Sequence, residues 1–459
     1  MDTRQFIAEH LHDDVHDLAL KKTPAGVDKT LALCQIEARQ LLQKKVPSWS
    51  VNDDLLFPPH LSIEQCSSEA AALYKASLLQ GQSFADLTGG LGVDCFFISQ
   101  HFQTSFYVER NPELCALAKH NFKVLADSGA LLSKGSSEGF MENGPTDAPA
   151  RPTDGLPRFI DVPARSTDGL PRSTDGLPRL TDVPTRLPEV INESAEAYLL
   201  HCEPVDCLFL DPARRDSHGH KTVSISDCTP NVLELQDLLL RKARRVMVKL
   251  SPMLDTSQAL KELHQVSEVH VVAVGNECKE LLFIMESGFE GTPRFTCVNL
   301  QSGQSMVTFT LEEERDSVSH LATKVGGYLY EPNAALMKGG CYKLLTQRFG
   351  VLKLHPHSHL YTSDQLVPSF PGRIFKVEGW APFNKKVKQE LLADVAKASI
   401  AVRNFPLTVA ELRKAWKIGD GDEDYLFATT LTGDQKIVIK TTRQGSFTLP
   451  SSTASRSGR

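Results

Sequence analysis

The feature that most constrains this 459-residue chain is a glycine-rich turn, D-L-T-G-G-L-G-V-D at residues 86–94, between an apolar segment and a helical run. Three glycines in four positions let backbone N–H groups approach a ligand with no Cβ in the way, and the helix start adds partial positive charge. A second apolar strand ends in Glu109, 23 residues after Asp86. That interval is close to the ~20 residues at which an acid reaches ribose hydroxyls in dinucleotide-binding units. The turn predicts a nucleoside site, although its spacing is not the G-x-G-x-x-G of nicotinamide or flavin binders. The alternative is an ordinary βαβ turn without a ligand.

Composition and charge exclude several classes of protein. The chain is 41% hydrophobic and 23% charged, which is ordinary for a globular protein, and its length allows two to four domains. A net charge of −6 gives no global sign of nucleic-acid binding, so any basic surface must be local. The cysteines include no C-x-x-C pair, which argues against a zinc ribbon or a redox pair. No apolar run or signal core suggests a membrane, so we expect a cytoplasmic protein.

Alternating strands and helices from residue 84 to about 285 predict a parallel, doubly wound sheet. The run V-H-V-V-A-V-G-N-E-C-K-E-L-L-F-I-M at 269–285 predicts an antiparallel closing hairpin, which would distinguish this sheet from a nicotinamide-binding one. Helical spacing predicts helices within 4–45 and over 70–79. The expected strands are 84–87, 106–108, 190–192, 207–210, 246–250, 269–274 and 281–285.

A low-complexity insert interrupts this domain. From 144 to 187 the sequence repeats every seven residues, with an arginine in each unit and S-T-D-G-L-P-R written twice in tandem. Every unit also carries proline, so a helix cannot persist, and we expect a disordered loop. An arginine-rich nucleic-acid contact is the alternative, against which the aspartate in each unit argues.

A second motif, V-D-C-L-F-L-D-P-A-R-R at 205–215, is an apolar strand that ends in Asp211 and Pro212. Ligands bind at the carboxyl edge of such sheets. Lys249 ends a further central strand and is expected near the same site. The alternative is a strand cap in which Asp211 accepts local N–H bonds. No metal is expected, because H-P-H-S-H at 355–359 lacks a further ligand at a suitable spacing.

These motifs together resemble those of a known family. D-x-x-G-G-x-G resembles the first motif of class I S-adenosylmethionine-dependent methyltransferases, and V-E-R-N-P-E-L-C-A-L-A-K-H-N resembles the second. L-D-P-A-R-R resembles the fourth motif of methyltransferases that act on base nitrogens. R-N-F-P-L-T-V-A-E-L-R-K-A-W-K at 403–417 resembles the signature of the THUMP-like domain. With L-S-I-E-Q-C-S-S-E and E-P-N-A-A-L-M-K-G-G, they make the chain look like the THUMP-like-domain class I methyltransferases of bacteria.

The resemblance implies an α/β fold: a Rossmann-like class I methyltransferase sheet with an N-terminal helical region and small α+β C-terminal domains. The expected parts are a helical region over 1–80, a methyltransferase domain over 81–285, a ferredoxin-like domain over 286–380, a THUMP-like domain over 381–450 and a disordered tail over 451–459.

It also implies S-adenosyl-L-methionine as cofactor. Asp86 would hold the cationic methionine end, and Glu109 the ribose diol. Asp211 and Pro212 would accept hydrogens from an exocyclic amine, with Arg214 supporting the base as the third expected catalytic residue. Ser194 stands where an adenine-binding acid is expected, and Ala213 and Arg214 replace the proline and aromatic of the fourth motif. The expected cofactor-binding residues are Asp86, Thr88, Gly89, Gly90, Gly92, Asp94, Glu109, Ser194, Gln65 and Ser67.

THUMP domains bind structured RNA, so the resemblance implies tRNA or rRNA as the partner. Cations beside aromatics in the last domain suit phosphates and unpaired bases. The expected substrate-binding residues are Arg215, Lys249, Arg403, Asn404, Phe405, Arg413 and Lys414. Our hypothesis is methylation of a base nitrogen in RNA. The alternatives are an RNA-binding protein without catalysis, or a methyltransferase acting on DNA, a protein or a small molecule.

Overall fold

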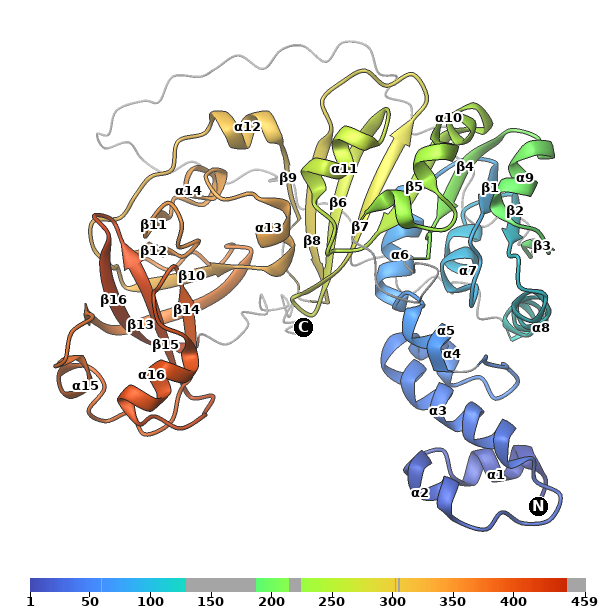
Figure 1. Cartoon of the computed structure of the whole chain (residues 1–459), viewed down its shortest axis with the longest axis horizontal. Coiled ribbons are helices and arrows are strands. Elements are labelled where there is room, and N and C mark those ends of the chain that lie inside the picture. The colour runs from blue at the N-terminus through green and yellow to red at the C-terminus, as the bar shows by residue number, and fades with distance from the viewer. Residues whose placement is uncertain (59, 129–186, 214–223, 302, 304–305, 444–459) are drawn as a thin grey trace, which may run out of the picture.

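The computed structural model of the chain describes residues 1–58, 60–128, 187–213, 224–301, 303 and 306–443. Figure 1 shows three parts: a group of N-terminal helices, a large twisted sheet flanked by helices, and a C-terminal part built on a second sheet. The seven-residue repeats and the tail at 451–459 lie outside the described residues, so the predictions made for them stay untested.

The N-terminal part is helical, as predicted, but the 4–45 region is divided into three helices. Asp14 and Asp28 begin new helices, because their carboxylates accept hydrogen bonds from the free N–H groups of the next turn. The helices are α1 (Thr3–Glu9), α2 (Val15–Leu20), α3 (Lys29–Lys45), α4 (Pro47–Ser50), α5 (His60–Gln65) and α6 (Glu69–Leu78).

The large sheet has the strand order β3-β2-β1-β4-β5-β7-β6-β8-β9. Its first five strands are parallel, and β7 runs antiparallel to both β5 and β6, so the predicted closing hairpin is confirmed. The strands are β1 (Ser83–Asp86), β2 (Thr104–Val108), β3 (Glu189–Ile191), β4 (Val205–Leu210), β5 (Ala243–Leu250), β6 (Val266–Val274), β7 (Glu277–Glu286), β8 (Arg294–Leu300) and β9 (Val307–Thr310).

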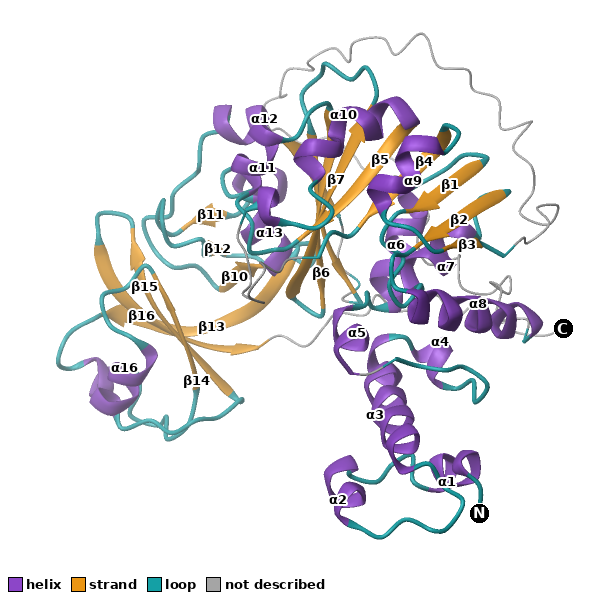
Figure 2. Cartoon of the chain, turned by 45° about the vertical axis from the view of Figure 1, so that its right-hand side comes forward, coloured by secondary structure: helices purple, strands orange, loops and turns teal. Residues whose placement is uncertain are grey.

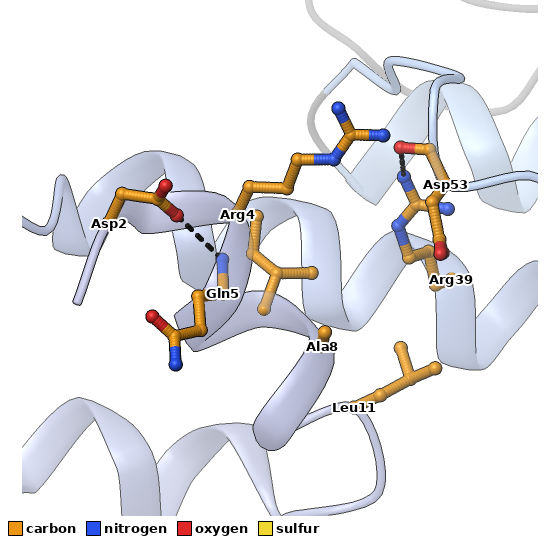
Figure 3. Close-up of a pocket in the computed structure, with 8 residues that line it drawn as sticks. Asp2, Arg4, Gln5, Ala8, Leu11, Arg39 and Asp53 are labelled. Carbon is orange, nitrogen blue, oxygen red and sulfur yellow. Dashed lines mark hydrogen bonds between the residues drawn. The ribbon is translucent and has the colours of Figure 1, made fainter.

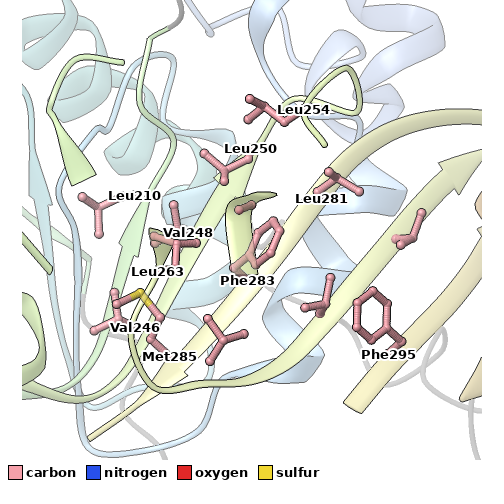
Figure 4. Packing of buried hydrophobic residues seen from close by; sticks show 14 of the residues in the cluster. Leu210, Val246, Val248, Leu250, Leu254, Leu263, Leu281, Phe283, Met285 and Phe295 are labelled. Atoms are coloured by element: carbon pink, nitrogen blue, oxygen red, sulfur yellow. The ribbon is translucent and has the colours of Figure 1, made fainter. Parts of the chain in front are cut away.

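Helices cover both faces of this sheet. One apolar core joins the sheet to α3, α6, α7 and α8, and the other joins it to α9, α10 and α11. Figure 4 shows the second core, where Val246 and Val248 of β5 pack beside Phe283 of β7. The helices that follow α6 are α7 (Val93–Ser99), α8 (Pro112–Asp127), α9 (Ala195–His201), α10 (Val232–Lys242) and α11 (Thr256–Glu262), with a 3-10 turn at Ile225–Asp227.

Two strands within 286–380, the range that we assigned to the ferredoxin-like domain, extend the large sheet instead. β8 pairs in parallel with β6, and β9 closes the edge antiparallel to β8. The reason is burial: Phe295 and Cys297 of β8 and Phe309 of β9 belong to the same core as β5 and β7. Chain order alone did not indicate this continuation past residue 285.

The C-terminal part is built on a seven-stranded sheet with the order β11-β12-β10-β13-β16-β15-β14, which Figure 2 shows beside the large sheet. Its strands are β10 (Tyr328–Pro332), β11 (Leu352–Lys353), β12 (Tyr361–Ser363), β13 (Gly372–Pro382), β14 (Ser399–Arg403), β15 (Asp424–Leu431) and β16 (Gln435–Arg443). The remaining helices are α12 (Leu311–Asp316), α13 (Ala334–Gly339), α14 (Leu344–Phe349), α15 (Val387–Glu390) and α16 (Val409–Trp416). Helix α13 packs against β6, β7 and β8, and so joins the two sheets.

Candidate active site

The glycine turn connects β1 to α7 and leaves no room for a side chain at Gly89 or Gly92. Gly90 and Gly92 have φ angles of +55° and +88°, in the left-handed region that side chains disfavour. A Cβ on Gly89 would lie 2.2 Å from the ring of Tyr107, which is itself buried. The turn therefore holds its backbone against β2 with no side chain between them.

Replacing Gly89 by alanine is expected to lower the free energy of unfolding by roughly 1–3 kcal/mol, because the added methyl group overpacks the Tyr107 ring. Urea unfolding measures this loss. The same substitution in a Tyr107→Ala background, where the ring is absent, should cost markedly less. An equal cost in both backgrounds would contradict the proposed clash.

The end of β2 is fastened to this turn through Glu109. Its Oε2 accepts a hydrogen bond from Gly90 N at 3.0 Å, and its Oε1 accepts one from Asn111 N at 2.8 Å. Tyr107 donates its hydroxyl to Gly90 O at 2.5 Å, and Asn192 donates its amide to Glu109 O at 2.9 Å. The carboxylate is thus fixed beside the glycines, with lone pairs left to accept further hydrogen bonds.

Asp86 is the last residue of β1, directly before the glycine turn, and is buried. Its Oδ1 accepts a hydrogen bond from Thr88 N at 3.0 Å. Burial raises the pKa of Asp86 well above its usual value, and the negative charges of Asp94, Asp211 and Glu109 raise it further. A cationic ligand bound beside Asp86 would stabilise its charged form.

The two sequence motifs meet at Thr88. Asp211 donates its backbone N–H to Thr88 Oγ1 at 2.7 Å, which joins the end of β4 to the glycine turn. The carboxylate of Asp211 is paired with the ammonium of Lys249, at the end of β5. Burial alone would lower the pKa of Lys249, but Asp211, Asp94 and Glu280 outweigh it and the pKa is raised. Lys249 is therefore a fixed cation and hydrogen-bond donor beside the Asp211 carboxylate.

A buried network beneath these residues centres on Lys75 of α6, whose side chain is 0% exposed. Its Nζ donates to both Glu280 oxygens, at 2.8 and 2.9 Å, and to Ser67 Oγ at 2.9 Å. Ser67 donates in turn to Asp94 Oδ2 at 2.7 Å, and Asp94 Oδ1 lies 3.1 Å from Nζ as an ion pair. Burial would raise the pKa of Asp94, but Lys75 and Lys249 lower it below its usual value. The network fixes α6, the start of α7 and β7 to one another.

Replacing Lys75 by methionine is expected to destabilise the fold by about 3–5 kcal/mol, because Glu280 would be left without its buried counterion. The midpoint of urea unfolding measures this. A Lys75→Met, Glu280→Leu double variant removes both charges of the pair and should recover much of the loss. A single variant as stable as the parent would contradict the role of Lys75.

The other residues expected to bind the cofactor lie at different places. Ser67 belongs to the Lys75 network, and Gln65 is exposed at the end of α5. Ser194 caps α9 by accepting a hydrogen bond from Ala197 N at 3.2 Å. Arg214, expected to be catalytic, and Arg215, expected to bind the substrate, lie outside the described residues. The roles given to these residues remain predictions.

The substrate-binding residues expected in the last domain lie on β14, in the loop after it and on α16. Arg403 is paired with Glu331 at 2.5 Å, and the exposed Asn404 donates to His355 Nδ1 at 3.1 Å. Phe405 packs edge-on against Phe383, with ring centres 5.0 Å apart. On α16, Arg413 is paired with Asp420 at 2.5 Å, whereas Lys414 is exposed.

A hollow of about 320 Å³ lies elsewhere, between α1 and α3 (Figure 3). None of its lining residues comes from the glycine turn, β4 or β5. Its Arg39 donates to the carbonyl oxygens of Asn52, Asp53 and Leu55 at 2.9–3.0 Å, so this guanidinium stabilises the loop after α4. The chemistry of the lining gives no reason to place a catalytic site there.

Among the described residues, no group of three or more His, Cys, Asp or Glu side chains is arranged to hold a metal ion. No helix in the part of the chain that the structure describes combines the length and apolar character needed to cross a bilayer.

The C-terminal part matches two domain families. Residues 328–371 match a ferredoxin-like domain, and residues 372–443 match a THUMP-like domain. These ranges begin at 328 and 372, whereas the sequence led us to expect 286 and 381. The chain thus joins a Rossmann-like methyltransferase fold to a THUMP-like domain. The combination that the sequence led us to expect is confirmed.

The solved structure of a proposed methyltransferase from Porphyromonas gingivalis W83 is similar over nearly the whole chain. It has 29% sequence identity and a TM-score of 0.74, and the match covers 96% of this chain and 98% of that chain. A tRNA (uracil-54, C5)-methyltransferase from Pyrococcus abyssi matches at 12% identity with a TM-score of 0.27, over 50% of this chain and 40% of that chain. The second likeness is too weak to argue from. No curated protein matches the chain.

Proposed function

We propose that this chain is an S-adenosyl-L-methionine-dependent methyltransferase. The observation that carries the proposal is that three acidic residues meet at the glycine turn: Glu109 accepts from Gly90 N, Asp86 accepts from Thr88 N, and the backbone of Asp211 donates to Thr88 Oγ1. Such a site repels the phosphates of nicotinamide and flavin dinucleotides and attracts a nucleoside that carries positive charge. S-adenosyl-L-methionine is such a nucleoside, with an ammonium and a sulfonium group.

The residues at the glycine turn fit this cofactor. The free side of the Glu109 carboxylate would accept hydrogen bonds from the ribose hydroxyls, since Gly90 N and Asn111 N already fix its orientation. Asp86 would hold the ammonium of the methionine end. The cofactor, when bound, supplies an electrophilic methyl group, so the protein contributes mainly position and charge.

The end of β4 would orient the methyl acceptor. The Asp211 carboxylate and the Pro212 carbonyl would accept hydrogens from an exocyclic amine, while the ion pair with Lys249 fixes the carboxylate. Arg214 would support the base. A base nitrogen of tRNA or rRNA is the proposed target, supported by the THUMP-like domain and by the Asp-Pro strand end.

Mass spectrometry of the modified nucleosides in total RNA tests this function. Cells that lack the protein should lose one methylated nucleoside, and the wild-type chain should restore it. The Asp211→Asn variant should not restore it. Identical nucleosides with and without the protein would exclude RNA methylation under those conditions, and would favour a binding protein without catalysis or another substrate.

A further inference from the structure

A second cluster of charge lies on the C-terminal sheet, where β10, β13 and the end of β14 meet. The side chain of Glu331 is only 6% exposed and is paired with two arginines. Arg373 donates to its Oε2 through Nε at 2.9 Å and through Nη2, and Arg403 donates to its Oε1 at 2.5 Å. The side chains of Arg373 and Arg403 are 36% and 38% exposed, so the buried carboxylate holds two solvent-facing guanidinium groups side by side.

Both guanidinium groups keep donors for a ligand. Arg403 donates from Nη1 to Val402 O at 2.8 Å. The Cζ atom of Arg373 lies over the Phe375 ring, 5.7 Å from the ring centre. Within the described residues, Arg373 Nη1 and Arg403 Nε have no hydrogen-bond acceptor. Two cations face one carboxylate, so the cluster also has a surplus of one positive charge. These are the properties of a site for a singly charged oxyanion.

Curvature of the sheet brings the two arginines together, although β14 lies at the edge far from β10. The loop between β11 and β12 contacts the opposite edge of the sheet. Ser358 donates to Thr430 O of β15 at 2.8 Å, and His355 accepts from Asn404, directly after β14, at 3.1 Å. Lys436 donates to Thr430 Oγ1 at 2.7 Å and adds a third cation to this end of the sheet.

A short connection links this cluster to the methyltransferase sheet. Asn333, two residues after Glu331, caps α13. Ala334 at the start of α13 donates its N–H to Asn276 Oδ1 at 2.9 Å, in the turn between β6 and β7. Lys338 at the other end donates to Leu254 O at 2.7 Å, in the loop after β5. Both partners lie at the carboxyl edge of the large sheet, where Asp211 and Lys249 also lie.

We propose that Arg373 and Arg403 bind a backbone phosphate of the RNA substrate, with Glu331 orienting both guanidinium groups. A phosphodiester carries one negative charge and offers oxygens to both arginines at once. Helix α13 connects the strand that carries Glu331 to the edge of the large sheet that carries Asp211. The inference rests on the proposed RNA substrate, and it assigns to Arg373 and Glu331 a role in binding as well as in joining strands.

Fluorescence anisotropy with labelled total tRNA, over a range of salt concentrations, tests the proposal on the full chain. Arg373→Gln and Arg403→Gln should each weaken binding about 3- to 10-fold, and the double variant should reduce the slope of log affinity against log salt by about 1 to 2. Arg315→Gln is the matched control, because Arg315 is exposed on α12 and is paired only with its neighbour Asp316 among the described residues. A double variant that binds tRNA as the wild type does, with the same slope, would overturn the proposal.

Glu331→Gln separates a phosphate site from a purely structural joint. Removal of the carboxylate leaves both guanidinium groups charged but no longer holds them side by side, so a phosphate site should bind tRNA severalfold more weakly. Folded Glu331→Gln protein, judged by circular dichroism, that binds tRNA as the wild type does would overturn the assignment. Equal losses by the double arginine variant on tRNA and on duplex DNA would likewise overturn the assignment to RNA. Calorimetry with S-adenosylhomocysteine tests cofactor binding separately. If that ligand did not bind, the tRNA-binding results for the arginine variants could still be interpreted.

Discussion

Asparagine in place of Asp211 is expected to lower methyl transfer at least about 100-fold while leaving cofactor binding within about twofold. The substitution keeps the shape of the side chain but removes the charge that is paired with Lys249 and that would hold the target amine. The backbone N–H bond to Thr88 is unaffected, so the glycine turn should keep its geometry. Transfer of a labelled methyl group to RNA from cells lacking the protein measures the first effect, and calorimetry with S-adenosylhomocysteine measures the second.

Asp206→Asn provides the matched control for this variant. Asp206 lies on the same strand, but its carboxylate accepts from Gln82 N and Ser83 N, at 2.6 and 2.9 Å, at the far end of β1. The Asp206→Asn substitution should change the free energy of unfolding slightly and leave the rate of methyl transfer unchanged. Unchanged turnover in Asp211→Asn would remove Asp211 from the mechanism.

Asparagine in place of Asp86 is expected to weaken binding of S-adenosylhomocysteine roughly 10- to 100-fold, the effect of losing a hydrogen bond to a charged group. Asp86 would hold the ammonium of the ligand, and an amide carries no charge to do so. Asp206→Asn again serves as the control. Binding of unchanged affinity in Asp86→Asn would show that the ammonium lies elsewhere.

The raised pKa of Asp86 adds a pH dependence to this prediction. The free protein holds a proton on Asp86 to higher pH than usual, and a bound ammonium group would lower that pKa. Binding should therefore release protons, and affinity should increase as the pH rises toward the pKa of the free protein, then level off. Calorimetry in buffers of different ionisation enthalpy measures the release. Equal proton release by the wild type and Asp86→Asn would assign it to another group.

Sequence reasoning located the parts of the site that depend on local spacing. The glycine turn, Glu109 and the Asp-Pro strand end each follow an apolar strand directly, and parallel strands bring their carboxyl ends to one edge. The structure does join them, through the bonds of Gly90 to Glu109 and of Asp211 to Thr88. The closing hairpin was equally visible, since its two apolar runs are adjacent in sequence.

Contacts between distant residues could not be found in this way. Lys75 and Glu280 are 205 positions apart in the sequence, so no local pattern indicates their pairing. The one available signal is that Lys75 is the single lysine within the apolar run of α6. The pairing of Glu331 with Arg403 depends on curvature of the second sheet, which no spacing encodes. The strands at 294–310 fall in the range that we assigned to the ferredoxin-like domain, because an apolar run does not indicate which of two sheets it joins.

The central claim is that the acid-lined glycine turn binds a cationic nucleoside bearing a methyl sulfonium group. Calorimetric titration of the full chain with S-adenosyl-L-methionine tests it most directly, with NAD as the comparison ligand. We predict saturable binding of one S-adenosyl-L-methionine per chain, lost in Asp86→Asn, and no binding of NAD. Absence of binding to the wild-type chain, or a preference for NAD, would contradict it.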